Sequence, residues 1–535
     1  PNWKLVPQKR GLKPEGPPAV YQLRAKKQNI GTLTKVTVGE KNLYKTNKTI
    51  LLVSETGAGK STLINALLNY TMGVKWEDKV WFEIVEDERR SQSESQTSDV
   101  IVYEIFGFEG KTLPYSLTII DTPGYGGTKG IERDVIISQR LFDLFSSDDG
   151  VHEISAVGLV VKASVNRLSQ RLMYIYDSVM SLFGKNMEKK IVAMITHSDG
   201  SRPKDVLLTL EAANIKCAKN EKNQPVYFLF DNQQHEERLE EKTFFKHSWE
   251  LTQKNINHFT DFLEKSSPQT LMTTVEVLKE RIRLTACIQN LQERIKLAEL
   301  KQTQIRQIQE ALKKLEAEMK RNERFTVEVH EVYKAKEPID GGLRLFLFYE
   351  AAVCCTVCEE NCHYPGCTMG WIPEHCEVMK GGRCTVCSRK CLASDHVKEK
   401  WRYVIKTRRV MKTNEEMKKQ YEKNKMESKK MLSLLESLGM EMNQLIVEKS
   451  KFLDESYQHV IRLEQIALKA DSASTIVHLD FLSEKMKEKR DTEKVQKLEE
   501  MRSRVDEGTR EAYWYKLAER SSAIKNIGRS FPWHK

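Results

Sequence analysis

The sequence lacks the long apolar run of about 18 residues that a membrane-spanning helix requires, so we expect no transmembrane segment. It also lacks a positively charged start followed by an apolar stretch, which argues against a secretory signal. We therefore expect a soluble, cytoplasmic protein. The sequence opens at Pro1 without a methionine, which leaves room for an upstream region.

Charge of one sign is not concentrated anywhere in the chain. The formal net charge is +11, from 86 Lys and Arg against 75 Asp and Glu, and it is spread over mixed Lys/Glu stretches. Solvated helix faces explain this pattern better than a nucleic-acid surface does. Cysteine is scarce outside one segment: nine of the eleven lie between Cys354 and Cys391. We interpret the isolated Cys217 and Cys287 as small buried apolar residues.

At 535 residues the chain is long enough for several structural units. Short β-branched runs alternate with helix-like segments up to about residue 263, which predicts an α/β fold with a mostly parallel sheet and helices on both faces. After Pro268, apolar residues near heptad spacing predict a long helical arm. A second helical tract predicts a return arm, so the simplest arrangement is an antiparallel helical hairpin with the cysteine segment at its tip. The expected divisions are an extended lead-in (1–47), an α/β domain (48–263), a first coiled-coil arm (264–324), a strand pair (325–412) enclosing a Cys/His module (354–396), a return arm (413–470) and charged C-terminal helices (471–535).

A glycine-rich segment follows the first strand run and precedes a predicted helix, which is the context of a phosphate-binding loop. It reads Ser54-Glu55-Thr56-Gly57-Ala58-Gly59-Lys60-Ser61, with Ser54 at the position of the usual first glycine. Backbone N–H groups and the helix N-terminus attract phosphate oxygens. We expect Lys60 to reach the β- and γ-phosphates and the Ser61 hydroxyl to bind Mg²⁺; an incidental turn is the alternative. The expected nucleotide contacts here are Glu55, Thr56, Gly57, Ala58, Gly59, Lys60, Ser61 and Thr62.

A second motif, Asp121-Thr122-Pro123-Gly124, ends the apolar run 117–120. A carboxylate at a strand end can hold Mg²⁺ through water, and a glycine N–H can contact a γ-phosphate. Between the two motifs lies the polar stretch 86–98, in which Thr97 is the candidate metal-sensing hydroxyl; a plain strand-start threonine is the competing interpretation. The candidate catalytic residues are Lys60, Thr97 and Gly124, and the candidate Mg²⁺ ligands are Ser61, Thr97 and Asp121.

The third motif, Thr196-His197-Ser198-Asp199, follows another strand run. A carboxylate at Asp199 can accept hydrogen bonds from the N1–H and N2–H₂ edge of guanine, which adenine does not present. His197 stands where the usual lysine of such a motif covers the base. Asn232, which ends the next strand run, is a further candidate for base binding, and an Asx turn is its alternative.

Together these motifs resemble the septin-like GTPases, and most closely the immunity-associated GTPases related to the chloroplast-import GTPases. The resemblance covers residues 49–232 and extends to the segments 166–169 and 182–184. It implies a Ras-like P-loop G domain, binding of GTP or GDP with Mg²⁺, and homodimerisation or assembly through the G domain. Tyr125 follows Gly124 where the Ras-like pattern has a water-orienting glutamine, so we expect slow hydrolysis.

The cysteine segment contains a repeat with a constant offset. The two sets of four are Cys355, Cys358, Cys362, Cys367 and Cys384, Cys387, Cys391, His396. Eight S and N ligands suit two tetrahedral zinc ions. His363, His375, Cys354 and Cys376 are spare candidates, and the sites are either sequential or crossed. A disulfide cluster or redox-active CxxC pairs are the alternatives.

Two functions therefore compete. The first is a Mg²⁺-dependent GTP-binding protein with slow hydrolysis, in which nucleotide state controls dimerisation or assembly through the helical arm. The second is a zinc-tipped coiled-coil scaffold whose G domain holds nucleotide without useful turnover. The zinc segment lacks a basic, aromatic-rich face, so a protein partner at the tip or coiled coil fits better than nucleic acid.

Overall fold

The computed structural model describes twelve stretches of the chain, which form two compact units. The units consist of residues 1–278, 463–480 and 497–535 in the first, and 279–462 and 481–496 in the second. The described stretches are 5–7, 18–30, 33–78, 80–85, 100–124, 131–166, 169–233, 242–319, 327–339, 351–367, 372–412 and 428–529. None of the helices in these stretches is long and apolar enough to cross a bilayer.

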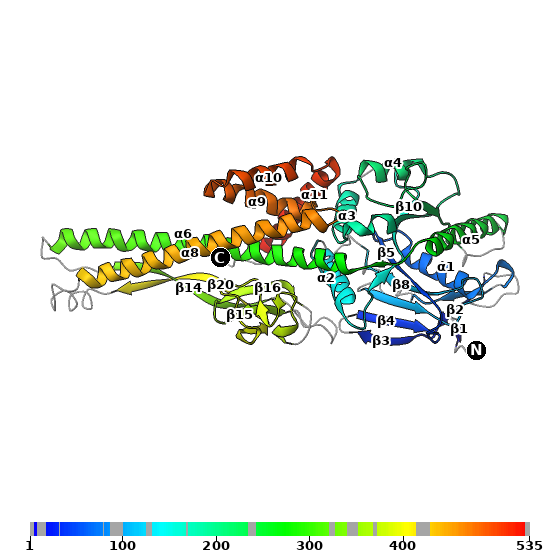
Figure 1. Cartoon of the computed structure of the whole chain (residues 1–535), viewed down its shortest axis with the longest axis horizontal. Helices are drawn as coiled ribbons and strands as arrows, with labels where there is room; N and C mark the ends of the chain where they lie inside the picture. Colours follow the sequence, from blue (N-terminus) through cyan, green and yellow to red (C-terminus); the bar gives the residue numbers. More distant parts are fainter. Residues whose placement is uncertain are drawn as a thin grey trace. The chain divides into compact units, whose positions relative to one another are not determined.

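The first unit is built on an eight-stranded sheet with the order β12-β11-β10-β5-β8-β7-β4-β3 (Figure 1). The five strands from β12 to β8 pair in parallel, whereas β7 runs antiparallel to β8. The strand bounds are β3 Lys26–Ile30, β4 Leu33–Val38, β5 Asn47–Ser54, β7 Ile101–Ile105, β8 Ser116–Asp121, β10 Ala156–Lys162, β11 Ile191–Thr196 and β12 Tyr227–Leu229. A smaller sheet joins β1 Leu5–Pro7, β2 Ala19–Leu23 and β6 Val80–Glu83.

The central strands are rich in apolar and β-branched residues because both faces of the sheet are covered. Every residue of β8 and of β11 is buried. Leu63 and Leu67 of α1, together with Phe259 of α5, belong to one buried cluster with the sheet. The helices of this unit include α1 Lys60–Met72, α2 Ile131–Ser146, α3 Gln170–Met180, α4 Lys204–Ala212 and α5 Lys242–Lys265. The predicted α/β architecture is confirmed.

Two segments outside the expected α/β boundaries pack into the first unit. Strands β3 and β4, from the predicted lead-in, extend the main sheet next to β7. At the other end of the chain, α11 (Glu507–Arg529) packs against α3, where the rings of Tyr174 and Tyr515 lie 5.5 Å apart. Gln170 donates to Glu511 at 2.6 Å in the same contact. Part of the predicted charged C-terminal region, including α11, therefore belongs to the first unit.

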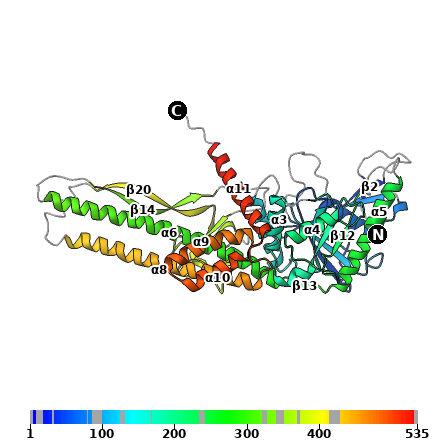
Figure 2. The ribbon, with the colours of Figure 1, turned by 90° about the horizontal axis from the view of Figure 1, so that it is seen from above.

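The second unit contains most of two long helices, α6 (Met272–Met319) and α8 (Ser428–Ile466), which lie side by side (Figures 1 and 2). Three ion pairs between them run in opposite sequence directions, so the helices are antiparallel. These pairs are Glu280–His459 at 2.6 Å, Arg294–Glu448 at 2.8 Å and Lys301–Glu441 at 2.6 Å. The predicted pair of helical arms is present.

A long two-stranded ribbon connects the helices to the cysteine module. It pairs β14 (Val327–Pro338) with β20 (Trp401–Lys412) in antiparallel orientation across twelve residues each. Tyr403, for example, lies opposite Lys336. The module itself has a sheet of β16 (Glu360–Cys367), β15 (Ala351–Cys355) and β19 (His396–Glu399), in that order.

The module does not lie at the tip of the helical hairpin, which corrects the expected arrangement. Its buried core includes Ala286 of α6, with Ile282 packed against it. Asn290 donates to the carbonyl of Asn361 at 3.2 Å, and Lys390 pairs with Glu455 at 3.0 Å. The contacting residues of α6 and α8 lie far from residues 319 and 428, the helix ends that are nearest to the ribbon in sequence. The ribbon therefore folds the module back against this distant part of the two helices.

Candidate functional site

The phosphate loop joins the end of β5 to the start of α1. Gly57 and Gly59 both have left-handed backbone angles, with φ of 80° and 85°, which L side chains rarely adopt. Gly59 is the N-cap of α1, and no side chain caps the helix there. The N-terminal N–H groups of the helix and its partial positive charge therefore face the loop without a protein carboxylate or hydroxyl as cap.

Lys60 and Asp121 meet in a buried cluster beside this loop. Strands β5 and β8 are parallel neighbours with Leu52 opposite Asp121, which places the end of β8 next to the loop. Lys60 Nζ donates to Asp121 Oδ1 at 2.5 Å, and the side chains are 6% and 0% exposed. Two separate sequence motifs predicted that these residues contact the same nucleotide, and the fold brings their side chains into contact.

Gly124 lies against the phosphate loop so closely that no side chain fits there. A Cβ added at Gly124 would lie 2.6 Å from Cα of Thr56, well inside van der Waals contact. The Thr56 hydroxyl donates to the Gly124 carbonyl at 3.3 Å. The backbone of the second motif is thus held against the first, which is the arrangement a γ-phosphate contact from both would need.

The third motif reaches the same loop from β11. Thr196 Oγ1 donates to the Ala58 carbonyl at 2.6 Å. The His197 ring lies next to Gly59, because a Cβ added there would be 3.3 Å from His197 Cε1. Burial and the neighbouring Lys162 charge lower the pKa of His197 despite the opposing effect of Asp231, so its imidazole is neutral at pH 7. A neutral ring at the loop is suited to stacking on a base.

Asp199 is exposed and oriented by its own turn. Its Oδ1 accepts from the Ser201 hydroxyl at 2.6 Å and from the Ser201 backbone N–H at 2.8 Å. These hydrogen bonds lower the pKa of Asp199, which keeps it ionised and able to act as an acceptor. The carboxylate is therefore fixed at the surface in the charged form that guanine recognition requires.

Asn232 contributes an unsatisfied amide beside this turn. The Ser198 N–H donates to the Phe230 carbonyl at 3.1 Å, which joins the segments that carry Asp199 and Asn232. Both Nδ2 and Oδ1 of Asn232 are buried without a hydrogen-bond partner among the described residues, which end at 233 on this segment. Buried amide atoms without partners are uncommon and point to a ligand that supplies them.

Some predicted positions lie outside the described residues. These are Thr97, with the whole polar stretch 86–98, and Tyr125, which was expected to slow hydrolysis. Ser61 and Thr62 are partly buried in the first turn of α1. The structure brings together Lys60, Asp121 and Gly124 with the glycine loop, while the role of Thr97 stays a prediction.

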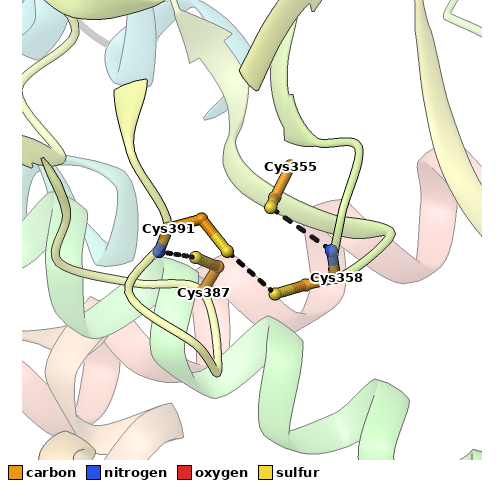
Figure 3. Close-up of side chains that lie close together, drawn as sticks. All are labelled: Cys355, Cys358, Cys387 and Cys391. Carbon is orange, nitrogen blue, oxygen red and sulfur yellow. Dashed lines mark hydrogen bonds between the residues drawn. The ribbon is translucent and has the colours of Figure 1, made fainter. Parts of the chain in front are cut away.

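The cysteine module presents its thiols in groups that cross the two halves of the repeat. One group consists of Cys355, Cys358, Cys387 and Cys391 (Figure 3), whose sulfur atoms all lie within 4.8 Å of one another. Cys358 and Cys391, from opposite halves, have sulfur atoms 3.6 Å apart. The structure therefore supports the crossed arrangement and not two sequential sets of four.

A second group shares one thiol with the first. It consists of Cys362, Cys384, Cys387 and His396, again within 4.8 Å of one another. His396 Nδ1 lies 2.8 Å from the Leu392 carbonyl and donates to it, and the ring also interacts with the Cys355 and Cys387 thiols. Its Nε2 is buried with no hydrogen bond of normal geometry from a described residue. The bonded nitrogen fixes the tautomer that leaves an Nε2 lone pair for a metal.

The remaining cysteines and histidines divide clearly. All eleven cysteines are free thiols, so the disulfide alternative finds no support in the structure. Cys354 is buried but bonds to Asn361 and to the Trp401 carbonyl, and His375 is exposed. Cys367 joins His363, Cys376 and Glu377 in a third group. Sequence reasoning missed Glu377, whose only signal was its position beside Cys376.

The loop, the buried lysine and the strand-end carboxylate define a P-loop nucleotide site. A sequence model of the septin family matches residues 45–134, the part of the chain that carries the first two motifs. Residues 45–134 are therefore similar to the P-loop domain of the septin family. A comparison with curated proteins gave no match.

Solved structures show a low overall similarity to this chain. Toc33 from Arabidopsis thaliana in complex with Mg²⁺ and GMPPNP is 16% identical, with 42% of this chain and 88% of that chain covered and a TM-score of 0.27. Toc33 in complex with GDP and Mg²⁺ is 15% identical over the same shares, with a TM-score of 0.28. Elongation factor SelB from Methanococcus maripaludis, in complex with the GTP analogue GppNHp, is 12% identical over 42% of this chain and 36% of that chain, with a TM-score of 0.24.

Proposed function

We propose that this protein binds GTP with Mg²⁺ and hydrolyses it slowly. The observation that carries the proposal is the buried contact of Lys60 with Asp121 on a glycine loop at an uncapped helix N-terminus. In this proposal Lys60 and the loop N–H groups hold the phosphates. Ser61 and Asp121 hold Mg²⁺, which neutralises charge that develops on the phosphate oxygens.

The base-binding end favours guanine. The ionised Asp199 accepts from N1–H and N2–H₂, the neutral His197 ring stacks on the base, and Asn232 uses its unsatisfied amide for the remaining base edge. A site built on such acceptors rejects adenine because the acceptors would then face adenine groups that cannot donate to them. Guanine selectivity follows from these three side chains acting together.

Nucleotide state controls dimerisation or larger assembly of the chain in this proposal. A ligand shifts such an equilibrium only if GTP and GDP stabilise the associating state differently. Isothermal titration with GTP and GDP in excess Mg²⁺ tests binding, and sedimentation velocity with GDP or a non-hydrolysable GTP analogue tests assembly. We expect heat with both nucleotides and a larger species with the analogue.

Matched variants make these measurements specific. Lys60→Met should abolish nucleotide heat, whereas Lys75→Met, at an exposed position, should leave it unchanged. No heat with either nucleotide would remove the proposed function. Binding without any change in sedimentation would instead favour the scaffold function, particularly if partner binding were salt-sensitive and independent of nucleotide.

The crossed cysteine groups form, in our proposal, a cluster of two structural zinc ions. Two thiolates on one tetrahedral zinc lie about 3.8 Å apart because each Zn–S bond is about 2.3 Å, close to the 3.6 Å between Cys358 and Cys391. Seven side chains supply two sets of four because Cys387 belongs to both. Cys387 is therefore the bridging thiolate. Closed sites of this kind stabilise a small module and leave no open position for catalysis.

A further inference from the structure

The third group of buried side chains consists of different residues from the proposed two-zinc cluster. It consists of His363, Cys367, Cys376 and Glu377, and it shares no residue with the other two groups. Their exposed fractions are 3%, 0%, 2% and 8%. Two thiols, an imidazole and a carboxylate thus converge in the interior of a module that has few apolar residues of its own.

The distances within this group fit a single tetrahedral ion. The sulfur atoms of Cys367 and Cys376 are 3.8 Å apart, which equals the separation of about 3.8 Å expected for two thiolates on one zinc. His363 Nδ1 lies 3.3 Å from the Cys376 sulfur and 2.7 Å from Glu377 Oε1. One ring nitrogen therefore faces a thiol and a carboxylate at once, although a single N–H can donate fully to only one of them.

Contacts with other protein groups do not fully explain why the Glu377 carboxylate is buried. Its side chain is 1% exposed, and Oε2 is buried with no hydrogen bond of normal geometry from the part of the chain that the structure describes. A buried carboxylate that is not fully bonded is costly unless a cation sits beside it. His363 and the Cys376 thiol both interact with the Glu377 carboxylate, but one imidazole is then the only cationic group of these four for a carboxylate and two thiols.

The local backbone explains how neighbouring residues serve different groups. Along β15 and β16, Cys354 lies opposite Asn361 and Val353 opposite His363, so Cys362 is the extra residue of a β-bulge. A bulge re-aims side chains at the point where it occurs. Cys362 joins the proposed two-zinc cluster, whereas His363, the next residue, joins the third group.

We propose that His363, Cys367, Cys376 and Glu377 form a separate site for one divalent transition metal ion, with zinc as the expected occupant. Two thiolates, a neutral imidazole and a carboxylate match the borderline-soft preference of Zn²⁺. The ion links the end of β16 to the segment that begins at Cys376. It is structural, because four protein ligands leave no open coordination position.

The test is the number of zinc ions in the full-length protein, measured by inductively coupled plasma mass spectrometry against protein concentration. Wild-type protein is expected to carry one more ion per chain than Cys376→Ser and Cys367→Ser. Cys354→Ser, which removes a buried thiol outside all three groups, should keep the wild-type number. The difference of one ion does not depend on how many ions the cysteine cluster holds or on nucleotide binding.

A conservative variant covers the case in which the serine variants do not fold. Glu377→Gln keeps the size of the side chain and removes its charge, and competition with a chromogenic zinc chelator should show one ion per chain released at about 10-fold lower chelator concentration. The proposal is overturned if Cys376→Ser keeps the wild-type ion count. It is equally overturned if Glu377→Gln releases zinc as the wild type does, or if mass spectrometry finds a Cys367–Cys376 disulfide in the native protein.

Discussion

At the scale of single residues, the proposed base selectivity depends on Asp199. Asp199→Asn replaces one acceptor oxygen by a donor NH₂, which matches the carbonyl of xanthine and not the amino group of guanine. A lost hydrogen bond to a charged group costs about 1.5–3 kcal/mol, so GDP affinity should fall by about 10- to 100-fold while affinity for xanthosine diphosphate rises. Isothermal titration with both nucleotides measures this change.

The matched control for this prediction is Ser201→Ala. It removes the hydroxyl that donates to Asp199 at 2.6 Å but leaves the carboxylate in place. The preference for GDP over xanthosine diphosphate should therefore persist in Ser201→Ala. An Asp199→Asn protein that still preferred GDP would show that another group reads the base.

The phosphate-contacting residues of the loop could be predicted one by one because they follow each other in the sequence and form a single loop. The grouping of metal ligands could not, because it depends on which turns pack together. Cys358 and Cys391 are 33 positions apart and yet have neighbouring sulfur atoms. Glu377 was missed for the same reason, since a glutamate in a polar segment gives no signal until burial deprives it of water.

At the scale of elements, Glu360 connects the cysteine module to the long helix α6. It is fully buried, accepts from Ser388 N at 2.8 Å and from Ser388 Oγ at 2.6 Å, and forms an ion pair with Arg294. The lengths of the helices were predictable from apolar spacing. The position of the module against α6 was not, because it is fixed by charged side chains that a periodicity search treats as solvent-exposed.

Removing the Glu360 charge should therefore destabilise the second unit. Glu360→Gln removes the buried carboxylate from Arg294, which keeps Glu448 as a partner at 2.8 Å, and losing hydrogen bonds to a charged group costs about 1.5–3 kcal/mol. Urea unfolding followed by a probe in the module measures the loss. Glu359→Gln, at an exposed neighbouring position, is the control and should stay within about 0.5 kcal/mol of wild type. Equal stabilities for the two variants would contradict the role of Glu360.

A second link between elements joins α3 to the C-terminal helices through Lys469. Its ammonium lies 3.3 Å from Asp177 and 3.3 Å from Asp506, and Asp177 also accepts from the N–H of Ala473 at 2.8 Å. Burial lowers the pKa of Lys469, but the two carboxylates raise it by more than burial lowers it. The pKa of Lys469 therefore lies above its ordinary value. Burial raises the pKa of Asp506, but the charge of Lys469 lowers it by more. The pKa of Asp506 therefore lies below its ordinary value.

These directions predict the pH dependence of the first unit. Asp506 has a depressed pKa, so its stabilisation is present above the ordinary value of 3.8 and is lost as pH falls through the lower folded value. Lys469 has a raised pKa, so its stabilisation is present below 10.5 and is lost as pH rises through the higher folded value. Stability should change little between these limits and fall on both sides.

The measurement is thermal unfolding against pH for wild type and Lys469→Met. The variant should be less stable at neutral pH and should lose less stability in acid, because Asp506 no longer gains from ionisation beside a cation. Lys204→Met, at an exposed position, should follow the wild-type profile. An acid limb of equal size in wild type and Lys469→Met would show that this cluster does not set the pH dependence.

At the scale of the whole molecule, the chain passes between its two units four times, at residues 278, 462, 480 and 496. Composition along the sequence could divide the chain into consecutive regions, but it could not assign 463–480 and 497–535 to the nucleotide-domain unit. That assignment depends on tertiary contacts such as Lys469 with Asp177. In the proposed function, each unit has a different source of ligand stabilisation, nucleotide for the first and metal for the second.

Ligands should therefore act on separate unfolding transitions. A ligand that binds only the folded state stabilises by about 2.7 kcal/mol at a free concentration of 100 times Kd, so GDP with excess Mg²⁺ should raise the Tm of one transition. A zinc-selective chelator in the same excess of Mg²⁺ should lower the Tm of the other, since metal-binding free energy is folding free energy in a small metal-bound module. Differential scanning calorimetry resolves the two, and Lys60→Met should lose the nucleotide response while keeping the chelator response. If chelation lowered the nucleotide-responsive transition as much as the other, the two units would unfold as one, and the separation of nucleotide and metal stabilisation would not hold.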